Sequence, residues 1–78
     1  MTPPDQRPRA LLLLVVGPHI RVLGTITPDA PIDLGLLDRI LRLQLAAQRG
    51  GGSLRLREAD PALLELLDLA GVRSLVAP

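Results

Sequence analysis

The chain has 78 residues, of which 47% are hydrophobic, and its nine basic residues against eight acidic ones give a formal net charge of +1. It has no cysteine, no aromatic residue and a single histidine. This excludes disulfides, thiolate or histidine-cluster metal sites, and the aromatic stacking platforms of single-stranded nucleic-acid binders. The length allows one small domain with an aliphatic core, and the near-neutral charge argues against nucleic acid as a partner.

The first nine residues, MTPPDQRPR, hold three prolines and mostly polar side chains. This composition predicts a disordered N-terminal tail over residues 1–9, followed by a single domain over residues 10–78. A basic segment before an apolar run is also a feature of signal peptides, but Gly17-Pro18-His19 is not a cleavage site of the small-residue type. We therefore expect a cytoplasmic protein.

The run ALLLLVV at residues 10–16 is apolar throughout. Seven residues are far too few to span a bilayer, so we expect no membrane insertion. A continuous apolar run that ends at Gly17-Pro18 is typical of a strand covered on both faces, as in a parallel or mixed sheet. A second strand is predicted at residues 20–26, IRVLGTI, where Gly24 indicates a bulge or a close backbone approach.

Residues 27–31, TPDAP, are expected to form a rigid connector, because each proline fixes one backbone angle and disfavours helix just before it. A long helix is predicted to begin at or just after Asp33, whose carboxylate can accept the free N–H groups of the first turn. This helix should end at Gly50-Gly51-Gly52, with Arg49 in the last turn, where the helix dipole favours a cation.

Residues 53–57, SLRLR, alternate between apolar and basic side chains, which predicts a half-buried strand near a sheet edge. Asp60-Pro61 then opens a last helix, with aspartate as its N-cap, and Gly71 ends it. A short final strand is expected at residues 72–76. The order of elements predicts an α/β fold, with a small mixed sheet of three to four strands and two helices packed on one face.

The long helix is apolar over about half of its circumference, more than the roughly 100° that a helix resting on one core needs. Its expected core face consists of Leu36, Ile40, Leu43 and Ala47. A second stripe lies roughly 140° away and consists of Leu34, Leu41 and Leu45. Either the last helix packs alongside and covers the second stripe, or this stripe stays partly exposed and binds another protein.

Groups suited to catalysis are scarce. A nucleophile needs a base within reach and a third group that orients the base, but the only imidazole, His19, stands beside a proline in a predicted turn. The glycine run at residues 50–52 lacks the Lys and Ser or Thr that complete a phosphate loop. We expect no enzymatic activity, no metal site and no cofactor.

The segment LDRILRLQLAAQRGGGSLRLREADPALLELLDLAGV resembles the second half of a STAS domain, the fold of anti-sigma factor antagonists. The likeness covers roughly residues 22–76 and includes a long helix, a glycine turn, a short strand, a helix start at Asp60-Pro61 and the ending Ala70-Gly71-Val72. The stretch RLQLAAQR before the glycine turn is especially similar to short actinobacterial members of the family.

The chain departs from the family pattern in two respects. The family's loop motif places its aspartate at Asp33 and its two hydroxyl residues at Leu34 and Gly35, so the serine that a partner kinase would phosphorylate is absent, and Gly35 occupies a degenerate phosphosite position. The family's first helix is also missing between the first two strands. One face of the sheet would then lack cover, which favours a protein partner or self-association.

The resemblance implies a non-catalytic regulatory module that binds an anti-sigma factor or a related switch kinase and so regulates transcription through a sigma factor. Without the hydroxyl, this binding would be constitutive. The family's contact surface maps onto Pro31, Ile32, Asp33, Leu34, Gly35, Leu36, Leu37 and Leu41. Two alternatives stay open: an accessory STAS-like subunit of a transport complex, and a degenerate remnant.

Overall fold

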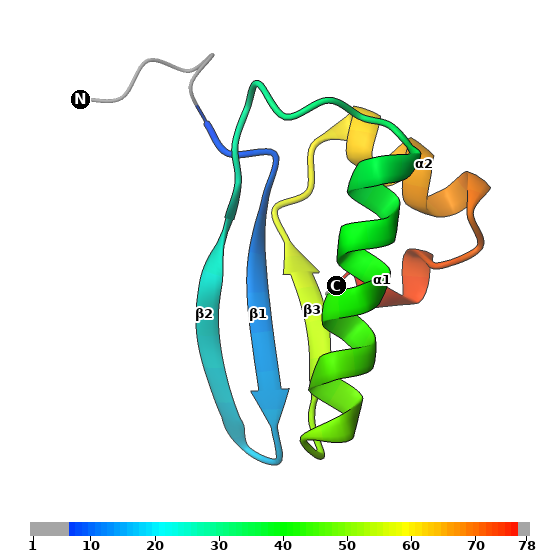
Figure 1. The fold of residues 1–78 in the computed structure, drawn as a ribbon. Coiled ribbons are helices and arrows are strands. Elements are labelled where there is room, and N and C mark those ends of the chain that lie inside the picture. Colours follow the sequence, from blue (N-terminus) through cyan, green and yellow to red (C-terminus); the bar gives the residue numbers. More distant parts are fainter. Residues whose placement is uncertain (1–6, 77–78) are drawn as a thin grey trace.

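Strands and helices follow one another in the order that the sequence predicts (Figure 1). The computed structural model of the chain describes residues 7–76. Its elements are β1 (Ala10–Val16), β2 (His19–Ile26), α1 (Leu34–Arg49), β3 (Ser53–Arg57), α2 (Pro61–Leu69) and a short 3-10 turn, η2 (Arg73–Leu75).

The three strands form one sheet in the order β2-β1-β3, and β1 in the centre is antiparallel to both neighbours. The predicted α/β class, with three strands and two helices, is confirmed. The named strands pair only in the antiparallel sense, and parallel pairing is limited to a single bridge between Leu56 and Val76. This bridge and η2 take the place of the final strand predicted at residues 72–76.

A bulge interrupts the hairpin of β1 and β2. Leu12 pairs with Gly24 and Leu13 pairs with Val22, so Leu23 is an extra residue on β2. The predicted bulge near Gly24 is therefore present. A Cβ atom at Gly24 would meet nothing within 4 Å, which rules out the alternative of a close backbone approach.

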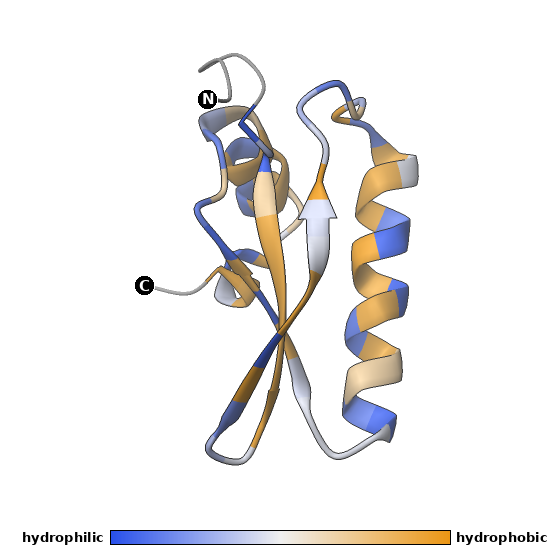
Figure 2. Cartoon of the chain, turned by 90° about the vertical axis from the view of Figure 1, so that its left-hand side faces the viewer, coloured by the Kyte–Doolittle hydropathy of each residue, from blue (hydrophilic) through white to orange (hydrophobic). Residues whose placement is uncertain are grey.

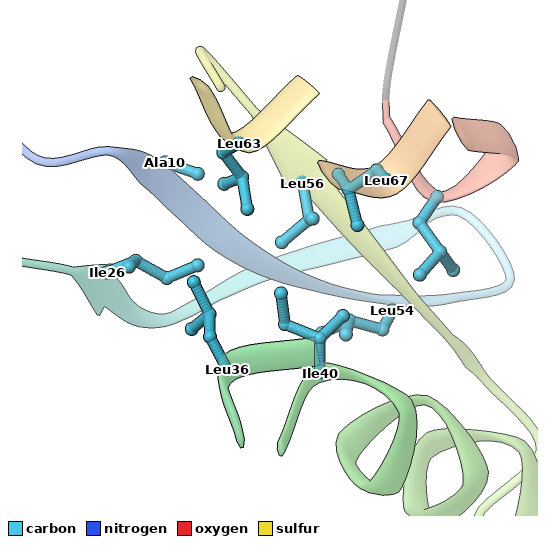
Figure 3. Close-up of a cluster of buried hydrophobic side chains, with 9 residues drawn as sticks. Ala10, Ile26, Leu36, Ile40, Leu54, Leu56, Leu63 and Leu67 are labelled. Atoms are coloured by element: carbon cyan, nitrogen blue, oxygen red, sulfur yellow. The ribbon is translucent and has the colours of Figure 1, made fainter. Parts of the chain in front are cut away.

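The hydrophobic core lies on one face of the sheet (Figure 3). Cross-strand partners and alternate residues share a face, so the register places Ala10, Ile26, Leu54 and Leu56 together on it. Leu36 and Ile40 of α1 and Leu63 and Leu67 of α2 pack into the same cluster, which Leu75 completes. Both helices therefore cover the same face, as predicted.

Neither α1 nor α2 packs its buried residues on the opposite face of the sheet, and η2 borders this face only at the β3 edge, where Arg55 donates to the carbonyl oxygen of Ser74. Figure 2 shows a strongly twisted sheet, whose strands cross in this view, with α1 on one side of it and hydrophobic residues along the central strand β1. The prediction that β1 is covered on both faces is therefore wrong. Its continuous apolar sequence reflects its central position in a sheet that is covered on one face only.

Arg9 connects three segments at one end of the sheet. Its guanidinium forms an ion pair with Asp60, with 2.7 Å between Nη1 and Oδ2, and its Nε donates to the carbonyl oxygen of Ala30 at 2.9 Å. Its backbone N–H donates to Ile26, and its carbonyl accepts from Asp60 N–H. Residues 1–6 of the predicted tail lie outside the described residues, whereas Arg9, its last residue, holds together the starts of β1 and α2 and the loop before α1.

Candidate partner-binding surface

The loop before α1 is held at both ends. Ala30 N–H donates to the carbonyl oxygen of Thr27 at 3.1 Å, which closes a turn with Pro28 at its second position, where the fixed angle of proline is favourable. The Ala30 carbonyl accepts from Arg9. The side chain of Ile32 is half-buried and packs against the core. These contacts make the loop a firm support for the residues that follow it.

Asp33 is the N-cap of α1, as predicted. Its backbone is extended, with φ −144° and ψ −178°, and its Oδ1 accepts from Leu36 N–H at 2.9 Å. Its carbonyl accepts from Leu37 N–H at 3.2 Å. The carboxylate thus satisfies a donor that has no partner within the helix. This cap fixes the orientation of the first turn and therefore the direction in which its side chains point.

The first turn divides the predicted contact residues between the surface and the core. Leu34 is 76% exposed, and Pro31, Asp33 and Gly35 are also exposed. Ile32, Leu37 and Leu41 are half-buried, and Leu36 is buried in the core cluster. Pro31, Leu34 and Gly35 are therefore all exposed next to the Asp33 cap, while Leu36 of the same turn packs into the core.

Gly35 is the position at which the resemblance to STAS domains predicts a hydroxyl residue. A Cβ atom at this position would lie 3.2 Å from Asp33 Oδ1, so a serine would press on the capping carboxylate. Residues 31–37 contain no serine, threonine or tyrosine. The first turn therefore offers an apolar surface without a phosphate acceptor.

The second stripe of α1 stays open to solvent. Leu45 is 55% exposed, Leu34 is more exposed still, and only Leu41 is half-buried. Helix α2 packs its buried leucines into the core cluster and does not cover this stripe. The explanation in which the last helix shields all three residues is therefore wrong. The second explanation, in which the stripe stays partly exposed, is the one that the structure supports.

The inward face of α1 is rotated from the predicted one. Leu36 and Ile40 are buried as expected and Ala47 is half-buried, but Leu43 is exposed. Gln44 takes the inward position, and its Oε1 accepts from Leu54 N–H on β3 at 2.7 Å. The sequence reasoning missed this contact, although the spacing of Gln44 from Ile40 and Ala47 places it on their side of the helix.

The uncovered face of the sheet is a second candidate surface. It carries Leu11, Leu13 and Val15 of β1, beside Ile20 and Val22 of β2 and Arg55 and Arg57 of β3. Ile20 is 64% exposed and Val22 is 65% exposed. The sequence indicated an uncovered face but did not identify these β2 residues, because their exposure depends on the order of the strands.

Groups for catalysis or metal binding do not converge in the part of the chain that the structure describes. His19 is exposed at the start of β2, far along the hairpin from Thr25 and Thr27. Residues 7–76 hold no cluster of three His, Cys, Asp or Glu residues that could bind a metal ion. Within the same range, every helix is too short or too polar to cross a bilayer.

Comparisons of the chain with protein-family models, with curated proteins and with solved structures found no match. The likeness to STAS domains therefore rests on the sequence features alone.

Proposed function

We propose that the chain is a non-catalytic protein-binding module of the STAS type, whose partner is an anti-sigma factor or a related switch kinase. The observation that supports it is the exposed first turn of α1. There, Leu34 projects into solvent from a helix end that the Asp33 cap and the Arg9–Ala30 contact hold in place.

An exposed leucine on a rigid support is well suited to a binding site. Full burial of its side chain against a partner would contribute about 2 kcal/mol, and the capped backbone loses little conformational freedom on binding. Pro31 and Gly35 have no polar side chain, so a partner can approach Leu34 closely on their side, and the neighbouring Asp33 carboxylate already accepts from Leu36 N–H. Leu41 and Leu45 extend the apolar stripe along α1.

Because residues 31–37 contain no hydroxyl side chain, we expect this binding to be constitutive and not switched by phosphorylation. In a phosphorylation switch, the added charge disrupts an apolar contact or creates a new ion pair, and both effects need an acceptor oxygen at the contact surface. Leu34 and Gly35 supply none. Regulation would then act through the abundance of the chain or through competition for the same partner.

The test is to mix the purified chain with a serine kinase of the anti-sigma class, with and without ATP. We expect a complex of equal affinity in both conditions and no phosphate on residues 33–37. Leu34→Glu should abolish the complex and leave the thermal melt unchanged, because the side chain is exposed. The matched control is Leu69→Glu, which changes an 83% exposed leucine on α2 and should bind normally.

Two results would contradict the proposal: a phosphoprotein modified within residues 33–37, or equal binding by the chain and its Leu34→Glu variant. A transport-complex subunit is the second candidate, since an accessory subunit needs more than one contact surface and the uncovered sheet face offers another. Co-purification with a transporter ATPase, instead of an anti-sigma kinase, would favour this second function.

A further inference from the structure

The uncovered face of the sheet has an apolar centre. Leu13 is buried there and Leu11 and Val15 are half-buried, while Ile20 and Val22 on the neighbouring edge strand are exposed. A shallow depression lies between Val15, Ile20, Arg55 and Val76. Since an exposed apolar patch on a small domain marks an interaction site more often than a single exposed residue does, this face is a candidate docking surface.

The charges on this face are all of one sign and lie along one edge. Arg55 and Arg57 stand on β3, opposite Leu13 and Leu11, and no strand contains an acidic residue. Arg55 donates to the carbonyl oxygen of Ser74 at 2.7 Å. Neither arginine has a carboxylate partner among residues 7–76. An occupant would therefore gain from acidic groups along the β3 side and from apolar groups elsewhere.

The dimensions of the face fit one helix. Three strands place the outer two about 10 Å apart, and an α-helix with its side chains is about 10–12 Å wide. The length of β1 corresponds to about 24 Å, which a helix of about 16 residues spans. The opposite face of the same sheet is covered by helices in this way.

We propose that the uncovered face is a docking surface for an amphipathic helix of a partner protein, with acidic residues along one flank of its apolar stripe. This inference is independent of the surface around Leu34. A second copy of the chain fits less well, because its strands bring the same arginines and no acid. A membrane fits less well too, because a lipid surface favours cations around the whole apolar patch and here they line one edge.

A designed peptide tests this proposal. The probe is a 16-residue amphipathic helix with a leucine stripe, one tryptophan and glutamates along one flank, and its counterpart carries lysines at the same positions. The chain has no aromatic residue, so tryptophan fluorescence reports the peptide alone. We expect the glutamate peptide to bind at least about tenfold more tightly than the lysine peptide at low salt, since the charge pairs with both Arg55 and Arg57 change sign between the two peptides.

Three variants locate the site. Val22→Glu should lower the affinity for the glutamate peptide by at least about tenfold, while Leu69→Glu, on α2, should leave it unchanged. Arg57→Glu should reverse the preference in favour of the lysine peptide. All three positions are exposed, and unchanged thermal melts would show that each variant folds.

Other results would overturn the proposal. Absence of binding by either peptide, or binding that Val22→Glu leaves unchanged, would show that the face takes no such helix. A dimer in sedimentation experiments that Val22→Glu dissociates, and that the peptide does not displace, would assign the face to a second copy. Binding to vesicles of anionic phospholipid, with no peptide binding, would assign it to a membrane surface.

Discussion

The two faces of the sheet use the same aliphatic residue types and have different surroundings. Ala10, Ile26, Leu54 and Leu56 lie under two helices and are buried, whereas Ile20 and Val22 on the other face are mostly exposed. A strand with apolar residues on both faces is normally covered on both. On β1 itself, Leu13 of the uncovered face is buried and Leu11 and Val15 are half-buried, so the exposed apolar residues of this face lie on β2.

The two edges of the sheet also differ in how far they are covered. On the β3 edge, Gln44 accepts from Leu54 N–H and Val76 forms a bridge to Leu56. The outer edge of β2 has no such neighbour within residues 7–76. The bulge at Leu23 makes this edge strand irregular. A bulge on an edge strand is one of the ways in which proteins limit unwanted strand pairing. The same part of the chain, from α1 to Val76, thus covers one face of the sheet and the β3 edge. The exposed apolar residues of the sheet lie mainly on β2.

The largest effect is expected in the centre of the covered face. Ile40 is 1% exposed and packs against the sheet, so Ile40→Ala should lower the free energy of unfolding by about 2–5 kcal/mol through lost burial and a cavity. Urea unfolding followed by circular dichroism measures this. A loss below about 1 kcal/mol would mean that α1 does not complete the core.

A steric test concerns the contact between the start of β3 and the end of β1. A Cβ atom at Gly52 would lie 2.7 Å from the Val15 carbonyl oxygen and 2.8 Å from Val16 Cγ2. Gly52→Ala should therefore cost about 1–3 kcal/mol through overpacking. Gly24→Ala is the matched control, because a Cβ there meets nothing within 4 Å. Equal melting of the two variants would contradict the close approach of these strands.

A smaller effect is expected at the ion pair that closes the covered face. Arg9→Ala removes the partly buried pair with Asp60 and the bond to Ala30, and should cost about 1–2 kcal/mol. Arg42→Ala removes an exposed pair with Asp38 on α1, and should cost at most about 0.5 kcal/mol. If thermal melts ranked the two variants in the opposite order, the anchoring role of Arg9 would be wrong.

Local signals in the sequence were sufficient for the three strands and for the two helices and their caps, but not for η2, which replaces the strand expected at residues 72–76. Asp33 and Asp60 cap the two helices as their positions indicated, with their carboxylates accepting from Leu36 and Leu63 N–H. Each cap acts within four residues, so the information is local. The absence of a hydroxyl side chain from residues 31–37 is equally local, whereas the exposure of Leu34 was one of two alternatives that the sequence left open.

Long-range contacts could not be predicted in the same way. Arg9 is bonded to residues 21 and 51 positions away, and no periodicity marks such a partner. Gln44 on the inner side of α1 depends on where β3 lies. The exposure of Ile20 and Val22 depends on the strand order, because β2 would be shielded on one side if it lay between two other strands. Tertiary packing, not propensity, decides these features.

The most direct test is the unfolding of the double variant Ile20→Thr, Val22→Thr, which shows whether the exposed apolar residues of β2 form a free surface that adds nothing to the core. Threonine keeps the branched shape and strand preference of the original residues. We expect a free energy of unfolding within about 1 kcal/mol of the parent chain, unchanged when the protein concentration is raised about a hundredfold. A loss of about 3 kcal/mol or more, or stability that rises with concentration, would show that this face is already buried in the chain alone or in its dimer.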